Sequence, residues 1–296
     1  MSKVTDLLSS KTLLLSDGAW GTQLMKRGLV PGQAPDPWNL DKPGPVGEVA
    51  AAYVSAGSNI ILTNTFGGTR IQLSRHNESA RTAAINTAGV QISKQAAGTK
   101  ALVFASMGPC GKMLMMGEIG ADEVLAAFTE QAVAIQAGGA DGIVVESFTD
   151  LDETELAVKA AASTGLPVVA SLTYDSGPDH TRTMMGASPE QAAQRLGPAG
   201  AAVIGANCGI GIDNYILVAR KYKAVWPGPI WIKANAGMPE MVDGKTVYRM
   251  TAETFGQRAV ELVEAGATII GGCCGTGPEF ITALKRELTQ RGMLRA

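Results

Sequence analysis

Short apolar runs alternate with longer amphipathic stretches along almost the whole chain. Four of these runs follow a turn of similar sequence, in which alanine and glycine precede two or three apolar residues. Such a turn predicts that a helix ends at a glycine and that a short buried strand begins directly afterwards. The four repeats span residues 56–61, 138–144, 199–204 and 265–270.

Four more apolar runs lie between the repeats, so that the chain has eight predicted strands. These runs span residues 12–16, 101–105, 167–172 and 230–233. Residues 121–137 and 152–163 carry apolar side chains at helical spacing between two pairs of strands. Ser188-Pro189, Thr251 and Pro278 are residue types that favour helix starts, which places further helices after them.

The alternation predicts an α/β protein with the (β/α)₈ (TIM) barrel fold. We expect one domain over residues 1–296, because no linker, low-complexity tract or charge block divides the chain. An open doubly wound sheet is the alternative. That fold usually places a G-x-G-x-x-G motif after its first strand, whereas here the first strand is followed by Asp17-Gly18-Ala19-Trp20-Gly21-Thr22.

Composition excludes several classes of function. The 296 residues carry a net charge of -2 and are 46% hydrophobic, as in an ordinary globular protein without the basic face of a nucleic-acid binder. No apolar run approaches the ~20 residues of a membrane helix, and residues 1–10 lack the apolar core of a signal peptide. We therefore expect a cytoplasmic protein with neither nucleic acid nor a membrane as partner.

Three of the four cysteines lie in glycine-rich turns at the ends of predicted strands. Cys208 follows the sixth strand, and Cys273 and Cys274 follow the eighth. Both strands flank the seventh, so the three thiols can meet at the C-terminal end of the barrel. Three thiolates are typical of a catalytic zinc with one open coordination position. The alternative is that they are small buried hydrophobes, but the flanking glycines favour a metal site.

Cys110 also lies at this end of the predicted barrel, after the third strand. As a fourth thiolate it would close the site and make it structural. We favour a bystander role, because Asn235 is a more plausible neutral neighbour of the open position. The two histidines, His76 and His180, fall in loops, and no serine lies in a G-x-S-x-G turn, so a hydrolytic triad is not expected.

Two acidic residues, Asp17 and Glu146, end the first and fourth predicted strands. They could bind loop amides, or they could form a pair of acceptors for the ammonium group of a ligand. Trp20 and Trp38 could pack in the core or face a cationic methyl donor. The methionines between Met113 and Met116 could fill gaps, or form a lid or a docking surface.

The chain resembles the homocysteine S-methyltransferase family over nearly its whole length. Its Gly271-Gly272-Cys273-Cys274-Gly275 and Asn207-Cys208-Gly209 motifs together are highly specific for that family. Three further motifs match: Asp17-Gly18-Ala19-Trp20-Gly21-Thr22, Leu62-Thr63-Asn64-Thr65-Phe66 and Asn235-Ala236-Gly237-Met238-Pro239.

The resemblance implies a zinc-dependent barrel that transfers a methyl group to the thiol of homocysteine and forms methionine. It implies that Cys208, Cys273 and Cys274 are the zinc ligands and that Asn235 lies close to the metal. It also implies that Asp17, Glu146 and the backbone near Gly18 and Ala19 hold the amino acid part of homocysteine. A free thiol has a pKa of ~8.5, and zinc would hold it as a thiolate.

The methyl donor is left open. The chain resembles a homocysteine-binding module alone, and no Asp-x-His-x-x-Gly corrinoid motif surrounds either histidine. The donor must be a small molecule or lie on a separate protein. An alternative function is a subunit of a corrinoid-dependent methyl-transfer system, and a third is a non-catalytic zinc-binding barrel. An exposed apolar collar around the site would favour a corrinoid protein, and a closed pocket with aromatic walls would favour a small donor.

Overall fold

The computed structural model describes residue 8, residues 12–242 and residues 245–294. Most of segment 1–10, in which the sequence shows no signal-peptide core, therefore lies outside the described residues. No helix within these ranges is both long enough and apolar enough to cross a membrane.

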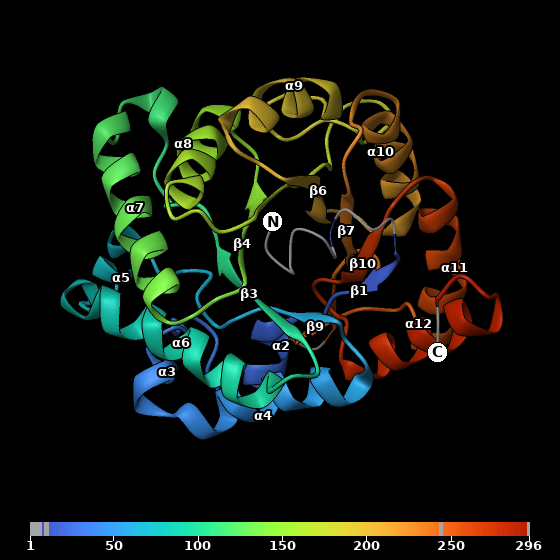
Figure 1. The fold of residues 1–296 in the computed structure, drawn as a ribbon, viewed down its shortest axis with the longest axis horizontal. Helices are drawn as coiled ribbons and strands as arrows, with labels where there is room; N and C mark the ends of the chain where they lie inside the picture. The colour runs from blue at the N-terminus through green and yellow to red at the C-terminus, as the bar shows by residue number, and fades with distance from the viewer. Residues whose placement is uncertain (1–7, 9–11, 243–244, 295–296) are drawn as a thin grey trace.

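Eight parallel strands in the described part of the chain form a nearly closed barrel, which Figure 1 shows at the centre of a ring of helices. Neighbouring strands follow the order β1-β10-β7-β6-β5-β4-β3-β2. The two outer strands meet through Asn59, whose amide donates to the Leu15 carbonyl at 2.7 Å and whose side chain accepts from the Leu15 amide at 2.8 Å. The predicted (β/α)₈ barrel is confirmed, and the open sheet is wrong. The strands are β1 (Leu14–Leu15), β2 (Ile60–Ile61), β3 (Leu102–Met107), β4 (Gly142–Phe148), β5 (Val168–Leu172), β6 (Val203–Cys208), β7 (Ile230–Ala234) and β10 (Ile269–Gly272).

The helices that surround the barrel begin and end at the residue types expected of them. Ser188 accepts from the Gln191 amide in a capping box with Pro189 in the first turn, as the sequence predicts. Gly57 and Gly200 end their helices in the left-handed conformation, with φ of 102° and 119°. The longer helices are α4 (Pro43–Ala56), α6 (Thr82–Ala97), α7 (Ala121–Ala137), α8 (Leu151–Ala162), α9 (Pro189–Ala199), α10 (Ile212–Val225), α11 (Ala252–Glu264) and α12 (Pro278–Gln290). The shorter ones are α2 (Trp20–Met25), α3 (Trp38–Asp41) and α5 (Arg70–Ser74), with 3₁₀ turns at Ser79–Arg81 and Leu114–Met116.

Strands β4 and β6 extend beyond their predicted ends, into positions where the side chains become polar. β6 continues through Asn207 to Cys208, which pairs with Ala234 of β7, so Cys208 is the last residue of the strand and does not follow it. β4 continues to Phe148, with a shift of register between Val145 and Phe148. A prediction from hydrophobicity alone ends these strands too early, because main-chain pairing does not require an apolar side chain.

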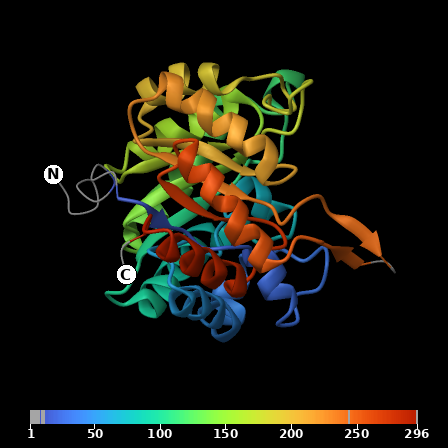
Figure 2. The same ribbon diagram turned by 90° about the vertical axis from the view of Figure 1, so that its right-hand side faces the viewer.

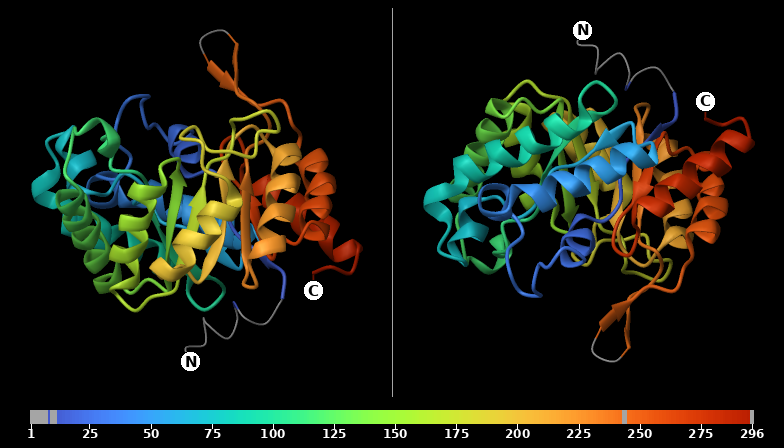
Figure 3. Two further views of the ribbon diagram at one scale, coloured as in Figure 1. Left: turned by 90° about the horizontal axis from the view of Figure 1, so that it is seen from above. Right: turned by 90° about the horizontal axis from the view of Figure 1, so that it is seen from below.

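An antiparallel hairpin that the sequence pattern does not predict follows β7. Its strands are β8 (Glu240–Val242) and β9 (Lys245–Val247). Figures 2 and 3 show that it extends away from the barrel. The residues of β8 are exposed, so no alternation of buried and exposed positions marks it in the sequence.

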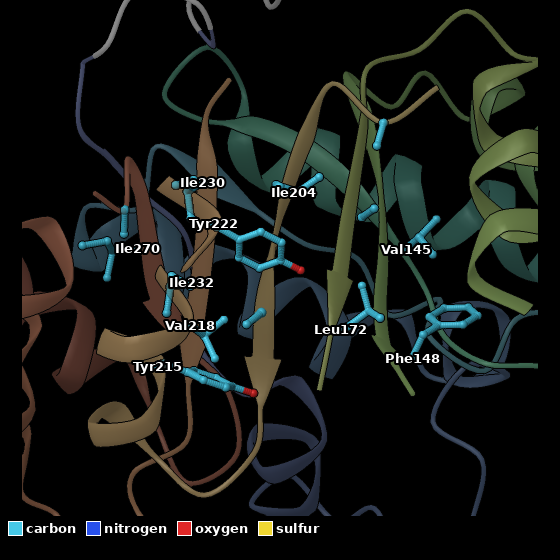
Figure 4. Packing of buried hydrophobic residues seen from close by; sticks show 14 of the residues in the cluster. Val145, Phe148, Leu172, Ile204, Tyr215, Val218, Tyr222, Ile230, Ile232 and Ile270 are labelled. Carbon is cyan, nitrogen blue, oxygen red and sulfur yellow. The ribbon is translucent and has the colours of Figure 1, made fainter. Parts of the chain in front are cut away.

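The core lies on both faces of the barrel wall. Outward residues of the strands pack against the helices, as Figure 4 shows for Tyr215, Val218 and Tyr222 of α10 beside Ile204 and Ile232. A second cluster fills the inside of the barrel, with members that include Leu14, Phe104, Val144, Val169, Val203, Trp231 and Ile269. The inner cluster is the apolar layer on which the polar end of the barrel rests.

We predict that Gly205→Ala destabilises the barrel. A Cβ atom at this position would lie 1.9 Å from the backbone oxygen of Trp231, so two paired strands would have to move apart. Such overpacking costs about 1–3 kcal/mol, measured as a lower urea midpoint. Gly44→Ala is the control, because nothing lies within 4 Å of its added Cβ. Equal midpoints for both variants would contradict the close packing of β6 on β7.

Candidate metal centre and acceptor site

Three cysteine sulfurs converge at the C-terminal end of the barrel. The Cys208 Sγ lies 3.0 Å from the Cys273 Sγ and 4.0 Å from the Cys274 Sγ, and all three lie within 4.8 Å of one another. Tetrahedral zinc with bonds of ~2.3 Å would place its sulfur ligands about 3.8 Å apart. No fourth histidine, cysteine or carboxylate joins this group within the described residues. The donor set therefore fits zinc with one position open to a ligand.

The protonation of these sulfurs depends on their crowding. Hydrogen bonds from Cys208 and Cys273 lower the pKa of Cys274 to about 3, and the Tyr248 hydroxyl contributes. The same contacts, together with burial, raise the pKa of Cys208 well above its ordinary value. Three thiolates at these distances would repel one another strongly unless a cation lay between them. The arrangement is therefore suited to hold a cation of high charge.

The backbone of the Cys208 segment is held in an unusual conformation. Cys208 has φ of +63°, which turns its sulfur away from the regular strand pattern. The carbonyl of Asn207 accepts from the Tyr215 hydroxyl at 2.5 Å and from the Thr173 hydroxyl at 3.1 Å. These contacts hold the backbone next to the cysteine and stabilise its left-handed conformation.

The second cysteine segment turns at Gly275, where φ is +81°. The ring of Tyr248 packs where a Cβ of residue 275 would lie, 2.3 Å from its Cγ atom. Glycine is therefore needed both for the turn and for the close approach of the ring. The turn lets the adjacent Cys273 and Cys274 reach the same centre.

Asn235 joins the two cysteine segments. Its Nδ2 donates to the Gly209 carbonyl at 2.6 Å, and its Oδ1 accepts from the Cys274 amide at 2.9 Å. These contacts place Asn235 beside the Cys274 segment, and its closeness to a metal stays a prediction. They also show what the side chain does, since one of its N–H groups and its carbonyl oxygen link the β6 end to the β10 end.

A layer of polar side chains lies between the apolar interior and the cysteines. Side chains alternate along a strand, so the residue two positions after an inward apolar residue also points inward. The inward pairs are Leu14 and Ser16, Phe104 and Ser106, Val144 and Glu146, Val169 and Ser171, and Trp231 and Lys233. This layer is the floor of the candidate site.

Asp17 is fully buried and its carboxylate is surrounded by donors. Its Oδ1 accepts from the Lys233 Nζ at 2.5 Å. Its Oδ2 accepts from the Trp20 indole and from the Leu62 amide, each at 2.7 Å. The Lys233 side chain is 2% exposed. Burial alone would lower the pKa of Lys233, but the carboxylates of Asp17 and Glu146 together raise it, so Lys233 is charged.

Glu146 lies at the register shift in β4 and has one oxygen available. Its Oε1 accepts from the Ser106 hydroxyl at 2.5 Å, and its Oε2 has no hydrogen-bond partner among the described residues. Burial raises the pKa of Glu146 to about 7, although the nearby charge of Lys233 opposes the shift. A ligand cation would favour the ionised carboxylate and complete its hydrogen bonding.

The segment after β1 lies next to Thr276. The Ala19 amide donates to the Thr276 carbonyl at 3.0 Å, so it is already paired. A Cβ at Gly18 would lie 2.8 Å from two oxygens of Thr276, which explains why a glycine is needed there. The Gly18 amide has no partner in the part of the chain that the structure describes.

The remaining sequence candidates lie away from the metal centre or serve the packing. Cys110 is buried in the outer core and is not part of the sulfur group, so the bystander interpretation agrees with the structure and closure of the site by Cys110 does not. Trp38 packs in a core cluster with Lys42 over its ring, and the Trp20 indole binds Asp17. His76 and His180 are exposed in loops.

Sequence reasoning missed Lys233 and Tyr248. Lys233 ends the apolar run Ile230-Trp231-Ile232 and was counted as a strand residue. A charged residue at an inward position of a buried strand is a signal that could have identified it. Tyr248 lies on the far side of the unpredicted hairpin, so no local pattern connects it to the cysteines.

The chain is similar to known proteins over nearly its whole length. The family model described as homocysteine S-methyltransferase matches residues 14–288. Methionine synthase of Mycobacterium tuberculosis is 28% identical over 302 residues, which cover 94% of this chain and 25% of that protein. Betaine–homocysteine S-methyltransferase 1 of Danio rerio is 28% identical over 317 residues, which cover 98% of this chain and 77% of that protein. The chain spans about a quarter of the length of the methionine synthases that it matches.

A solved structure shares the fold. The metallated form of the homocysteine methyltransferase MmuM from Escherichia coli superposes with a TM-score of 0.77 and 23% identity, covering 93% of this chain and 96% of that one. Since the family model covers nearly the whole barrel, including the Cys208 and the Cys273–Cys274 segments, the chain belongs to the homocysteine S-methyltransferase family.

Proposed function

We propose that residues 1–296 form a homocysteine-binding barrel that transfers a methyl group to the homocysteine thiol with the help of zinc. The product is methionine. The observation that carries the proposal is the group of three cysteine sulfurs within 4.8 Å, with no fourth protein ligand among the described residues. The names of the relatives support homocysteine as the acceptor, because two of them name it and a third names methionine.

Cys208, Cys273 and Cys274 would hold the zinc. When bound, zinc supplies a positive centre that favours the anionic form of the acceptor sulfur while the three thiolates keep that sulfur nucleophilic. Asn235 and Tyr248 hold the cysteine segments in place. The protein residues thus fix the position where the acceptor sulfur meets the methyl donor.

Other residues of the floor would hold the amino acid part of homocysteine. The unpartnered Oε2 of Glu146 would accept from its α-ammonium group, and the Gly18 amide is a donor without a partner. Asp17 would act on the same subsite indirectly, through its hydrogen bonds with the Lys233 ammonium group, the Trp20 indole and the Leu62 amide. A charge-assisted hydrogen bond of this kind contributes about 1.5–3 kcal/mol.

The reaction is a displacement at a methyl carbon. A bond forms between the homocysteine sulfur and the carbon, while the bond between the carbon and the donor's leaving atom breaks and its electron pair leaves with the donor. The thiol proton is released to solvent before the attack. Cys208, Cys273 and Cys274 remain unchanged, and no histidine base is required.

A second candidate is the methyltransferase subunit of a corrinoid-dependent system. Exposed methionines from three loops at the C-terminal end of the barrel favour it: Met113, Met115, Met116, Met184, Met238 and Met241. We call these residues the methionine collar. Flexible apolar side chains at a rim are typical of protein-binding surfaces. The collar thus supports a donor carried on a separate protein.

A methyl-transfer assay separates these candidates. Zinc-loaded protein is mixed with homocysteine and, in turn, with betaine, S-methylmethionine, S-adenosylmethionine, methyltetrahydrofolate and methylcobalamin, and methionine is measured. Turnover with one of the first four donors supports the proposal. Turnover with methylcobalamin alone supports the second candidate. If none of them gives methionine, the proposal of a homocysteine methyltransferase fails for these donors, and a non-catalytic zinc-binding barrel gains support.

We predict that Cys208→Ala loses most of its zinc and that Cys110→Ala retains one zinc per chain. Only the first substitution removes a sulfur from the converging group. Metal content after dialysis, measured by mass spectrometry, gives the stoichiometry. Full zinc and full activity in Cys208→Ala would contradict the assignment of the ligands.

Asn235→Ala should weaken zinc binding although Asn235 is not a ligand. The substitution removes both bonds that join Gly209 to Cys274, so the sulfur positions are no longer fixed. Loss of such an outer contact typically lowers metal affinity about 10–100-fold. Competition with a coloured chelator measures the change. An affinity equal to that of the unsubstituted protein would show that the cysteine segments hold their positions without the Asn235 link.

A further inference from the structure

Ser147 has a backbone conformation that few residues other than glycine adopt. Its φ is +65°, at the register shift between Val145 and Phe148 of β4. Such a residue is strained and persists only where its surroundings hold it. Asn207 of β6 provides this support, because its Oδ1 accepts from the Ser147 amide at 2.9 Å and its Nδ2 donates to the Ser147 hydroxyl at 2.7 Å. The Ser171 hydroxyl also donates to the Asn207 Oδ1, at 2.8 Å.

This arrangement directs two donors at two of the cysteine sulfurs. The Ser147 Oγ lies 3.8 Å from the Cys208 Sγ. A cysteine that holds a metal has lost its proton, so the hydroxyl must then be the donor in this contact. The Asn207 Nδ2 has two hydrogens, and besides Ser147 it contacts the Cys273 Sγ at 3.9 Å.

The third sulfur has a donor from another segment of the chain. The Tyr248 hydroxyl donates to the Cys274 sulfur, and the tyrosine ring packs on Gly275. The three sulfurs therefore have three different side-chain donors: Ser147 for Cys208, Asn207 for Cys273 and Tyr248 for Cys274. Because these contacts use the hydroxyl and amide hydrogens, none of them remains for a thiolate in the open position.

A hydrogen bond changes what a thiolate can do. It stabilises the negative charge and makes the sulfur a weaker nucleophile. A methyl donor that reaches this centre would meet four thiolates, three from the protein and one from the acceptor. Methylation of a protein sulfur would turn a thiolate ligand into a thioether and damage the metal site. The reaction therefore needs a difference in reactivity between the ligand sulfurs and the acceptor sulfur.

We propose that Ser147, Asn207 and Tyr248 are positioning residues that direct the methyl group to the acceptor, because their hydrogen bonds make the three ligand sulfurs less reactive. This inference rests on the proposed function and adds to it a means by which the site avoids methylating itself. A serine that only shaped the register shift of β4 would have no influence on the reactivity of Cys208.

Methylation of the protein itself tests the proposal. Zinc-loaded protein without acceptor is treated with iodomethane, which forms a sulfur–carbon bond while iodide leaves with the electron pair of the carbon–iodine bond. Initial rates at each cysteine are measured by mass spectrometry of peptides. Ser147→Gly removes the hydroxyl and suits the left-handed backbone, so this variant should fold. Its rate at Cys208 should rise about 3–10-fold, the range for the loss of one charge-assisted hydrogen bond, and its rate at Cys274 should not change.

Tyr248→Phe is the matched variant for another sulfur. It keeps the ring that packs on Gly275 and removes only the hydroxyl. The rate should rise at Cys274 and stay the same at Cys208. Unchanged rates in both variants, or an equal rise at all three cysteines in either of them, would overturn the proposal.

The spectrum of cobalt-loaded protein separates reactivity from access of the reagent. Loss of a hydrogen bond raises the energy of the sulfur electrons, so the sulfur-to-cobalt charge-transfer band should move to longer wavelength in Ser147→Gly and in Tyr248→Phe. Easier access alone would leave the band in place, and faster methylation with an unmoved band would contradict the proposal.

Methionine formation by the unsubstituted protein shows which of the two proposals a negative result concerns. Zinc-loaded protein that forms no methionine with any donor refutes the proposed function, and this inference fails with it. Active protein whose methylation rates and charge-transfer band do not respond to Ser147→Gly and Tyr248→Phe refutes this inference alone.

Discussion

Three cysteine sulfurs within 4.8 Å of one another form an arrangement that could hold a metal ion. At these distances the crowding leaves Cys274 as the favoured site of negative charge and raises the pKa of Cys208. A divalent metal bound here would remove the conflict, because it would attract all three thiolates at once. The contacts around the site maintain this arrangement: Tyr215 and Thr173 hold the Cys208 segment, Gly275 turns the second segment, and Asn235 joins the two.

The barrel turns this local chemistry into a binding site. Its inward positions change from apolar to polar within two residues along several strands, so a charged floor lies directly beneath the cysteines. Asp17 and Lys233 form a buried pair there, and Glu146 adds a second carboxylate. A buried pair of this kind is weak evidence for stability, since burial costs each ion its hydration. In the proposed function, the pair forms part of the polar floor below the three cysteines.

Much of this arrangement could be predicted from the sequence, and the failures have physical causes. The alternating apolar runs identified all eight barrel strands, and the glycine-flanked cysteines identified the three sulfurs that converge. The ends of β4 and β6 were placed too early, because β4 continues beyond Glu146 to Phe148 and β6 stays paired with β7 through Asn207 after hydrophobicity ends. The Asp17–Lys233 pair joins residues 216 positions apart, so only the closed barrel shows it. The exposed hairpin, with Tyr248 just beyond it, has no pattern of burial that the sequence could reveal.

The central claim is that the acceptor thiol loses its proton when it binds at the three-cysteine centre. Calorimetry of zinc-loaded protein near neutral pH, in buffers of different ionisation enthalpy, measures the protons released on binding. Homocysteine is compared with methionine, which has the same amino acid end but no thiol proton, so any proton lost from Glu146 is common to both. The account predicts that homocysteine releases about one more proton than methionine, since a free thiol has a pKa of ~8.5. Equal release by the two ligands would contradict activation of the thiol at this centre.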